Sequence, residues 1–140
     1  MSNQNKLIAR RIVEEVWNNQ NYAAVDEHVA RDFVGHSLEE IRGPEGYKQF
    51  FSALHQAFPD IHFSIEDVLA EEDKVAMIWT AEATHRGEFL GVPSTGKRVT
   101  TSGITMGRIA NGKVIEGWTA ADMLGLLQQL GAVPAPDRTG

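Results

Sequence analysis

The stretch SALHQAFPDIHFSIE, residues 52–66, decides the fold because the spacing of its apolar residues changes in the middle. Before Phe58 the apolar residues follow one face of a helix, in the stripe Tyr47, Phe50, Phe51 and Leu54. After Pro59 they occupy every second position, at Ile61, Phe63 and Ile65. A helix therefore ends near Phe58, and a strand with one buried face begins at Ile61.

The residues before this change are expected to be mainly helical. Apolar spacing predicts helices over 2–19, 22–30 and 43–58, the last with Pro44 in its first turn, where a missing N–H costs nothing. Between the second and third helices, Phe33, Val34 and His36 are expected in an irregular segment.

The residues after this change are expected to form a meander of strands. The first strand runs from Ile61 to a turn at 71–73, and three more follow over 75–85, 99–109 and 114–121. Residues 110–112 read as a hairpin turn, and a last helix over 123–130 ends at Gly131. Helices first and strands later predict an α+β fold, in which a strongly curved antiparallel sheet forms a cone with a pocket at its open end.

Composition narrows the range of functions. The 140 residues fit a single domain, expected over 1–132, with a mobile Pro-rich tail over 133–140. A net charge of −6 with scattered basic residues argues against nucleic acid, and no apolar run is long enough to cross a membrane. The absence of cysteine removes disulfides and thiolate chemistry, and no signal-peptide pattern opens the chain, so a cytoplasmic protein is expected.

The fourth strand and its exit carry the first candidate chemistry. Glu116, Trp118, Ala120 and Asp122 share one parity, so a regular strand puts two carboxylates and an indole on one face. A carboxylate beside an indole in a dry pocket has a raised pKa, which suits general acid/base catalysis. The alternative is that both carboxylates are solvated and that Asp122 only caps the last helix.

Two histidines are further candidates. His85 ends a strand whose face is otherwise apolar, and it is either a hydrogen-bonded core residue or a ligand contact. His36 follows Phe33 in the segment expected to be irregular, where binding residues collect. Large apolar side chains, Met77, Trp79 and Trp118, either line a pocket or fill the core.

The loop THRGEFLGVPSTGKR, residues 84–98, resembles a ligand loop at first sight. Its STGK segment lacks the spacing of a phosphate-binding loop and precedes a strand, and HExxH, GxSxG and GxGxxG are absent from the chain. No ligand spacing supports a metal site. We expect a wide turn in which Gly87 and Gly91 adopt positive φ, and in which Phe89 and Leu90 lie at the rim of the pocket.

Three segments together resemble a known family. AFPDIHFSIEDVLAEEDKVA (57–76), TAEATHRGEFLGVPSTGKRV (80–99) and GRIANGKVIEGWTAADMLGLLQQLGA (107–132) are similar to the SnoaL-like polyketide cyclases, also called ester cyclases, of the NTF2-like superfamily. The resemblance implies an NTF2-like cone, usually assembled as a homodimer, that binds a small hydrophobic substrate and uses neither metal nor cofactor. The best-studied members close a ring by intramolecular aldol condensation.

The resemblance also implies roles for residues. The family's acid/base aspartate begins the C-terminal helix, the position of Asp122. His85, and with it His36, would hydrogen-bond the substrate oxygen. The expected pocket walls are Phe33, Phe51, Trp79, Met106, Trp118 and Phe89.

This chain departs from the family on its third strand. Met106 stands where a polar side chain is expected to polarise the substrate carbonyl. The scaffold also supports isomerases, hydroxylases and epoxide hydrolases, and a non-catalytic protein that binds a small ligand is a further alternative.

Overall fold

The computed structural model describes residues 2–134, so most of the predicted tail, 135–140, lies outside the described residues. The first helix, α1 (Ser2–Ile12), continues as a π-helical segment, η1 (Val13–Asn18), which agrees with the helix predicted to residue 19. The long helix α3 (Gly43–Ala57) and the last helix α4 (Met123–Leu130) also lie where the sequence predicted them.

Six strands form one curved sheet in the order β2-β1-β6-β5-β4-β3. The four predicted strands are β3 (His62–Glu71), β4 (Lys74–Thr84), β5 (Arg98–Ala110) and β6 (Lys113–Ala121), all paired antiparallel. The predicted hairpin turn between β5 and β6 is confirmed, since Asn111 and Gly112 both have positive φ, at 52° and 78°.

Between residues 22 and 42 the sequence prediction was right about the helical character of residues 22–28 and wrong about the residues that follow. The expected helix over 22–30 is a 3₁₀ turn, η2 (Tyr22–Ala24), followed by the single-turn helix α2 (Val25–His28). The expected irregular segment is instead strand β1 (Val29–His36), which is followed by the short strand β2 (Glu40–Arg42). β1 pairs in parallel with β6, about 80 residues away, so local periodicity carried no signal for it.

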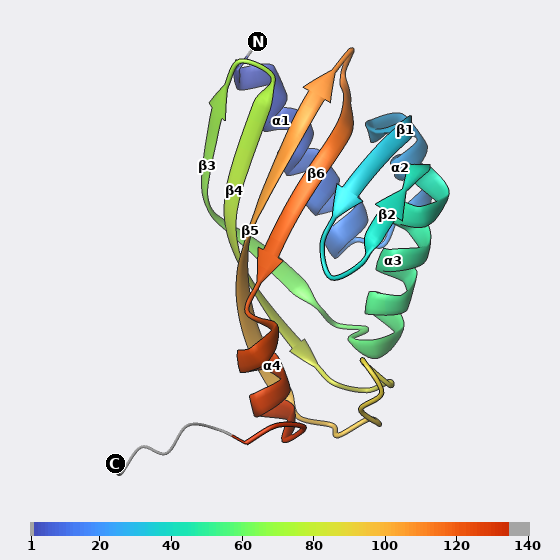
Figure 1. Cartoon of the computed structure of the whole chain (residues 1–140), viewed down its shortest axis with the longest axis vertical. Helices are drawn as coiled ribbons and strands as arrows, with labels where there is room; N and C mark the ends of the chain where they lie inside the picture. The colour runs from blue at the N-terminus through green and yellow to red at the C-terminus, as the bar shows by residue number, and fades with distance from the viewer. Residues whose placement is uncertain (1, 135–140) are drawn as a thin grey trace.

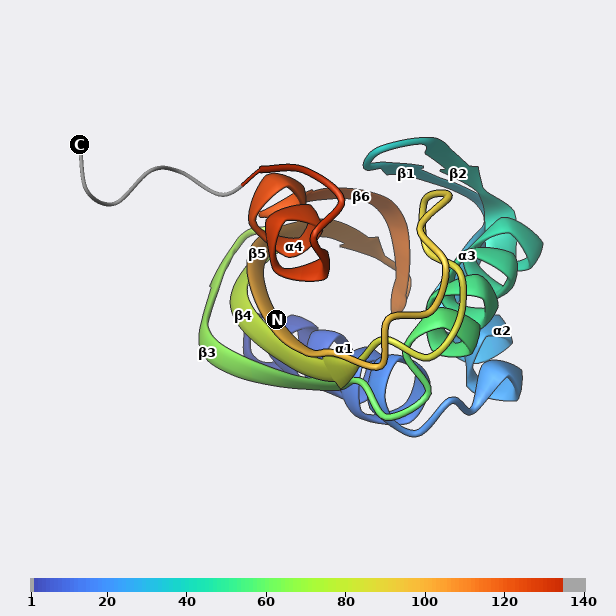
Figure 2. The same ribbon diagram turned by 90° about the horizontal axis from the view of Figure 1, so that it is seen from below.

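The sheet curls around the helices (Figure 1), and the view from below shows the concave side of β3–β6 facing α1 and α3 (Figure 2). The register shifts between Ile65 and Asp67 in β3, and between Arg108 and Ile109 in β5. Such bulges bend a sheet and increase its twist. The predicted inward face of β4 is confirmed, because Val75, Met77, Trp79, Ala81 and Ala83 are all buried.

The loop between β4 and β5 lies at the lower end of the molecule, beside the end of α3 (Figures 1 and 2). Gly91 has the expected positive φ of 81°, but Gly87 does not. Gly87 is instead a close-approach position, since a Cβ there would lie 2.5 Å from the carbonyl oxygen of Gln56. The glycine therefore lets this loop lie against the end of α3, where Gly87 N donates to Ala57 O at 3.1 Å.

Candidate functional site

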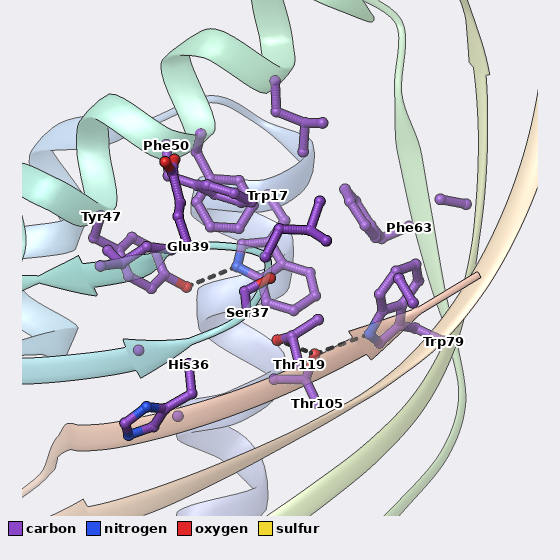
Figure 3. Close-up of a pocket in the computed structure, with 18 of the residues that line it drawn as sticks. Trp17, His36, Ser37, Glu39, Tyr47, Phe50, Phe63, Trp79, Thr105 and Thr119 are labelled. Carbon is purple, nitrogen blue, oxygen red and sulfur yellow. Dashed lines mark hydrogen bonds between the residues drawn. The ribbon is translucent and has the colours of Figure 1, made fainter. Parts of the chain in front are cut away.

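A cavity of about 1250 Å³ lies between the concave face of the sheet and helices α1 and α3. Its deep wall is mainly apolar and aromatic, with side chains from the helical segments and from the sheet (Figure 3). The lining includes Ile12, Trp17, Phe33, Tyr47, Phe51, Phe58, Phe63, Met77, Trp79 and Leu126. Exposed charged residues border the same space, namely Glu39, Glu40, Arg42, Glu45 and Glu88.

One polar contact of the deep wall joins the N-terminal helical segment to α3. The indole Nε1–H of Trp17 donates to the Tyr47 hydroxyl oxygen at 2.7 Å (Figure 3). Both residues are buried, and burial raises the pKa of the Tyr47 phenol well above its ordinary value. Tyr47 therefore stays protonated and neutral at physiological pH.

A second polar contact lies on the sheet. The Trp79 indole donates to Thr105 Oγ1 at 3.0 Å, and Thr105 Oγ1 lies 3.0 Å from Thr119 Oγ1 (Figure 3). Thr105 and Thr119 are direct partners in the pairing of β5 with β6, so both side chains leave the sheet on the same face. Both threonines line the cavity.

The two indoles are held by aromatic packing. Trp17 and Trp79 meet edge to face with centroids 6.2 Å apart, and Phe63 packs against both at 5.0 and 5.2 Å. The partner of Trp79 on β5 is Gly103, and a Cβ at that position would collide with the indole ring. Only glycine therefore leaves room for Trp79 at this point of the sheet. The positions of both N–H donors are therefore fixed by the core.

Most of the predicted wall residues line the cavity. Those that do are Phe33, Phe51, Trp79 and Phe89, and Met106 and His36 border the cavity as well. Met106 is the register partner of Trp118 and follows Thr105, so its side chain leaves β5 on the face opposite the threonines. The imidazole of His36 nevertheless binds Glu116 Oε2 at 2.9 Å and stacks on Trp118 at 5.6 Å. In Figure 3 it points away from Thr105 and Thr119.

Trp118 and Glu116 alternate with Gly117 and Thr119, which line the cavity, so they leave β6 on its other face. There Arg108 lies over the Trp118 ring at 5.9 Å and 3.8 Å from Glu116 Oε1. Neither Trp118 nor Glu116 is among the described residues that line the cavity. The predicted role of Trp118 as a wall stays a prediction.

His85 is fully buried and organises the β4–β5 loop. The backbone N–H of Thr95 donates to His85 Nδ1 at 3.1 Å, which leaves the imidazole proton on Nε2. The His85 backbone is also bonded to the loop, with His85 N donating to Lys97 O at 2.9 Å and Gly96 N donating to His85 O at 2.8 Å. His85 is not among the described lining residues, and its role toward a substrate stays a prediction.

Asp122 is the N-cap of α4. Its Oδ1 accepts the backbone N–H of Gly125 at 2.9 Å, and the residue is exposed. The residues on either side of it, Ala121 and Met123, line the cavity, whereas Asp122 is not among the described lining residues. Asp122 therefore lies at the rim, in the capping arrangement that the sequence left open as the alternative.

Sequence reasoning missed Trp17, Tyr47, Thr105 and Thr119. Trp17 and Tyr47 lie on helical stripes, where core packing is the default interpretation. The threonines had a weak signal in the sequence. Thr105 shares a strand face with Gly103 and Gly107, and Thr119 shares one with Gly117 and Ala121. Small residues on one face of a curved strand leave space in front of it.

One group of potential metal ligands lies away from these residues. Ligand atoms of Glu15, Glu27 and His28 come within 4.8 Å of one another, and His28 Nε2 is 3.2 Å from Glu15 Oε1. None of the three belongs to the described cavity lining. A group of this kind is common without an ion, so we assign it no role.

Comparison with known proteins gives a consistent family. The family model described as SnoaL-like polyketide cyclase matches residues 7–130. Aklanonic acid methyl ester cyclase DnrD of Streptomyces peucetius is 30% identical over 148 aligned positions, which span 98% of this chain and 97% of the relative. DauD of a Streptomyces species, with the same activity in its name, is also 30% identical, over 98% of this chain and 88% of its own.

Solved structures agree with this result. AclR of Streptomyces galilaeus, a proposed hydroxylase, superposes with a TM-score of 0.88 at 31% identity, over 99% of this chain and 88% of its own. A proposed SnoaL-like polyketide cyclase from Jannaschia sp. CCS1 gives a TM-score of 0.87 at 28% identity, over 95% of both chains. The predicted α+β, NTF2-like fold is confirmed.

Proposed function

The chain belongs to the SnoaL-like polyketide cyclase family, and we propose from this membership that it closes a ring in a small hydrophobic polyketide by intramolecular aldol condensation, without a cofactor. The observation that carries the proposal is the cavity, which is apolar and aromatic in depth and contains neutral hydroxyl groups. A fused-ring substrate buries its faces against such walls, while its oxygens meet the hydroxyls.

No helix among residues 2–134 is long and apolar enough to span a membrane.

The proposed reaction needs one proton acceptor. A carboxylate removes a proton from the carbon next to a carbonyl, the enolate carbon attacks a second carbonyl, and the carboxylic acid returns the proton to the new alkoxide. One C–H bond and the π bond of the second carbonyl break, one C–C bond and one O–H bond form, and the product is an isomer of the substrate.

Asp122 is the proposed acid/base. Its support is the family position at the start of α4 and its place between two residues that line the cavity. In the structure its carboxylate is bonded to Gly125 N, so catalysis requires the side chain to leave its cap when substrate binds. Glu39, a lining residue in the β1–β2 turn, is the competing carboxylate.

The test is direct conversion of aklanonic acid methyl ester by the purified protein, followed by chromatography and mass spectrometry. We expect a product of unchanged mass and altered retention. The Asp122→Asn variant should lose at least about a hundredfold in rate, whereas Glu39→Gln should not. Absence of conversion by the wild-type protein would reject this substrate class, and full activity of Asp122→Asn would reject the proposed base.

A second candidate function is hydroxylation. Its support is the similarity to AclR, which is 31% identical to this chain, against 30% for DnrD, and superposes on it with a TM-score of 0.88. The same assay separates the two, because hydroxylation adds the mass of one oxygen atom and ring closure adds none.

The homodimer implied by the resemblance also stays a proposal. Ile78 and Ile104 are neighbours in the register of β4 and β5, and both are exposed, at 46% and 52%. A second copy covering this face would bury them. Sedimentation of the purified protein at the mass of one chain would reject the dimer.

A further inference from the structure

Two hydroxyl groups in the cavity have their oxygen bonded by an indole N–H. The indole nitrogen donates and cannot accept, so the direction of each bond is fixed without seeing a hydrogen. Trp17 donates to Tyr47, and Trp79 donates to Thr105. In both cases the hydroxyl oxygen is the acceptor, and its own proton must point elsewhere.

For Tyr47 the result is one unused proton. The phenol has a single O–H, and its only recorded bond among the described residues is the one it accepts from Trp17. Tyr47 is only 8% exposed and lines the cavity, so this proton has little access to bulk solvent. Because the phenol stays neutral, the group is a hydrogen-bond donor throughout the physiological pH range.

For the threonine pair a count of protons gives the same result. Thr105 and Thr119 have two hydroxyl protons, and a single hydrogen bond of 3.0 Å joins them. That bond uses one proton, and the Trp79 N–H already occupies an acceptor position of Thr105. Whichever hydroxyl donates, one proton of the pair is left without an acceptor among residues 2–134.

We propose that these two unused protons form a two-point binding site for a polycyclic aromatic ligand with two carbonyl or carbonyl-like oxygens. Tyr47 hydrogen-bonds one oxygen, and the Thr105–Thr119 pair hydrogen-bonds the other. The inference deepens the proposed function, on which its choice of ligand class rests. It gives the neutral hydroxyls a role that sequence reasoning assigned to the histidines.

Aromatic packing gives the site its selectivity. Trp17 stacks on Phe51 at 5.4 Å, and Tyr47 packs against Phe51 at 5.0 Å and Phe33 at 5.6 Å. An apolar ring system gains the same wall contacts whether or not it has oxygens. A ligand with oxygens also gains hydrogen bonds to donors that are otherwise buried and unpaired, the situation in which such bonds contribute most.

The experiment compares 9,10-anthraquinone with anthracene, which has the same ring skeleton and no oxygen. Binding is titrated by tryptophan fluorescence, and the carbonyl stretch of bound anthraquinone is recorded by infrared difference spectroscopy. We expect the wild-type protein to prefer anthraquinone, and the carbonyl band to move to lower wavenumber on binding.

The variants remove the hydroxyl protons with little change in side-chain shape and keep the indole N–H groups of Trp17 and Trp79. Tyr47→Phe and the double variant Thr105→Val/Thr119→Val should each weaken anthraquinone about three- to tenfold, the scale of one neutral hydrogen bond, and leave anthracene unchanged. Each should also return part of the carbonyl band toward its unbound position. Thr119→Val alone should keep most of the preference, because Thr105 then retains both its bond from Trp79 and a free proton.

Matched controls change the same residue types outside the cavity. Tyr22→Phe removes a hydroxyl bonded to His55 at 2.6 Å, and Thr80→Val removes an exposed hydroxyl bonded to Glu66 at 2.9 Å. Neither should alter the preference for anthraquinone.

The outcomes separate this inference from the proposed function. A wild-type protein that binds both probes equally, or cavity variants that leave the preference and the carbonyl band unchanged, would overturn the two-point site and leave the cyclase assignment to its own assay. An effect of only one cavity variant would overturn the two-oxygen assignment. Failure of the wild-type protein to bind either probe would overturn the two-point site, and the conversion assay alone would then decide the proposed function.

Discussion

Substitutions at Asp122 separate a structural role from a catalytic one. In the structure the carboxylate makes one capping bond, from Gly125 N to Oδ1 at 2.9 Å, at the start of an eight-residue helix. Replacing an N-cap by Ala costs about 1 kcal/mol in the free energy of unfolding, within a range of roughly 0.5–2. For a domain of this length that corresponds to a fall in Tm of about 3 to 4 °C.

Asparagine at this position distinguishes the two roles, because it caps a helix about as well as aspartate and cannot act as a base. Asp122→Asn should therefore unfold within a few tenths of a kcal/mol of the wild type. Its rate of ring closure should nevertheless fall at least about a hundredfold. Asp122→Ala should lose both stability and rate.

The assays are urea unfolding followed by circular dichroism and turnover measured on the same preparations. An Asp122→Ala variant as stable as the wild type would refute the capping argument, since the bond to Gly125 would then contribute nothing. An Asp122→Asn variant with wild-type turnover would refute the assignment of the base, and Glu39 would become the carboxylate to test.

Two further predictions concern stability. Gly103→Ala should lower the free energy of unfolding by about 1–3 kcal/mol, because the new Cβ meets the Trp79 ring and lies 2.8 Å from Ala120 O. Urea titration should show a smaller loss for the control Gly117→Ala, whose new Cβ has its nearest contact at 3.5 Å. Burial lowers the pKa of His55, so the folded protein takes up the imidazole proton less readily than the unfolded chain does. The stability that the neutral imidazole contributes is fully present above the unfolded pKa of about 6.5. It is lost as the pH falls from there toward the lower folded pKa. Urea titrations at about pH 8 and about pH 5 should show that decline, and His55→Gln should reduce it.

The predictable part of the fold is the part with local periodicity. The change of spacing at Pro59 correctly marked the end of α3, and the alternation over 75–83 correctly identified the inward face of β4. The strand β1 was missed because its stability comes from a parallel partner far along the chain. Its burial alternates, with Phe33 and Gly35 buried, but a glycine gives no hydrophobic signal for a strand.

The candidate site was harder to predict than the fold. Periodicity placed Phe51 and Trp79 on apolar faces, and the family resemblance suggested pocket walls at Phe33 and Phe89; all four residues line the cavity. It could not show which polar atoms remain unpaired, because that depends on both partners of each bond. The threonine hydroxyls became relevant only when the register of β5 with β6 brought Thr105 opposite Thr119.

The distribution of charge limits the chemistry that the cavity can support. The Glu and Arg residues in its lining are all exposed, whereas among residues 2–134 the deep wall offers only neutral donors: indoles, a phenol and two hydroxyls. Neutral donors stabilise a developing oxyanion less than a buried cation does. The proposed ring closure therefore requires a substrate that spreads the enolate charge over its own conjugated rings, and isolated ketones should bind without reacting. A base at the rim avoids the cost of a buried, unpaired charge, because a carboxylate there stays solvated until the substrate arrives.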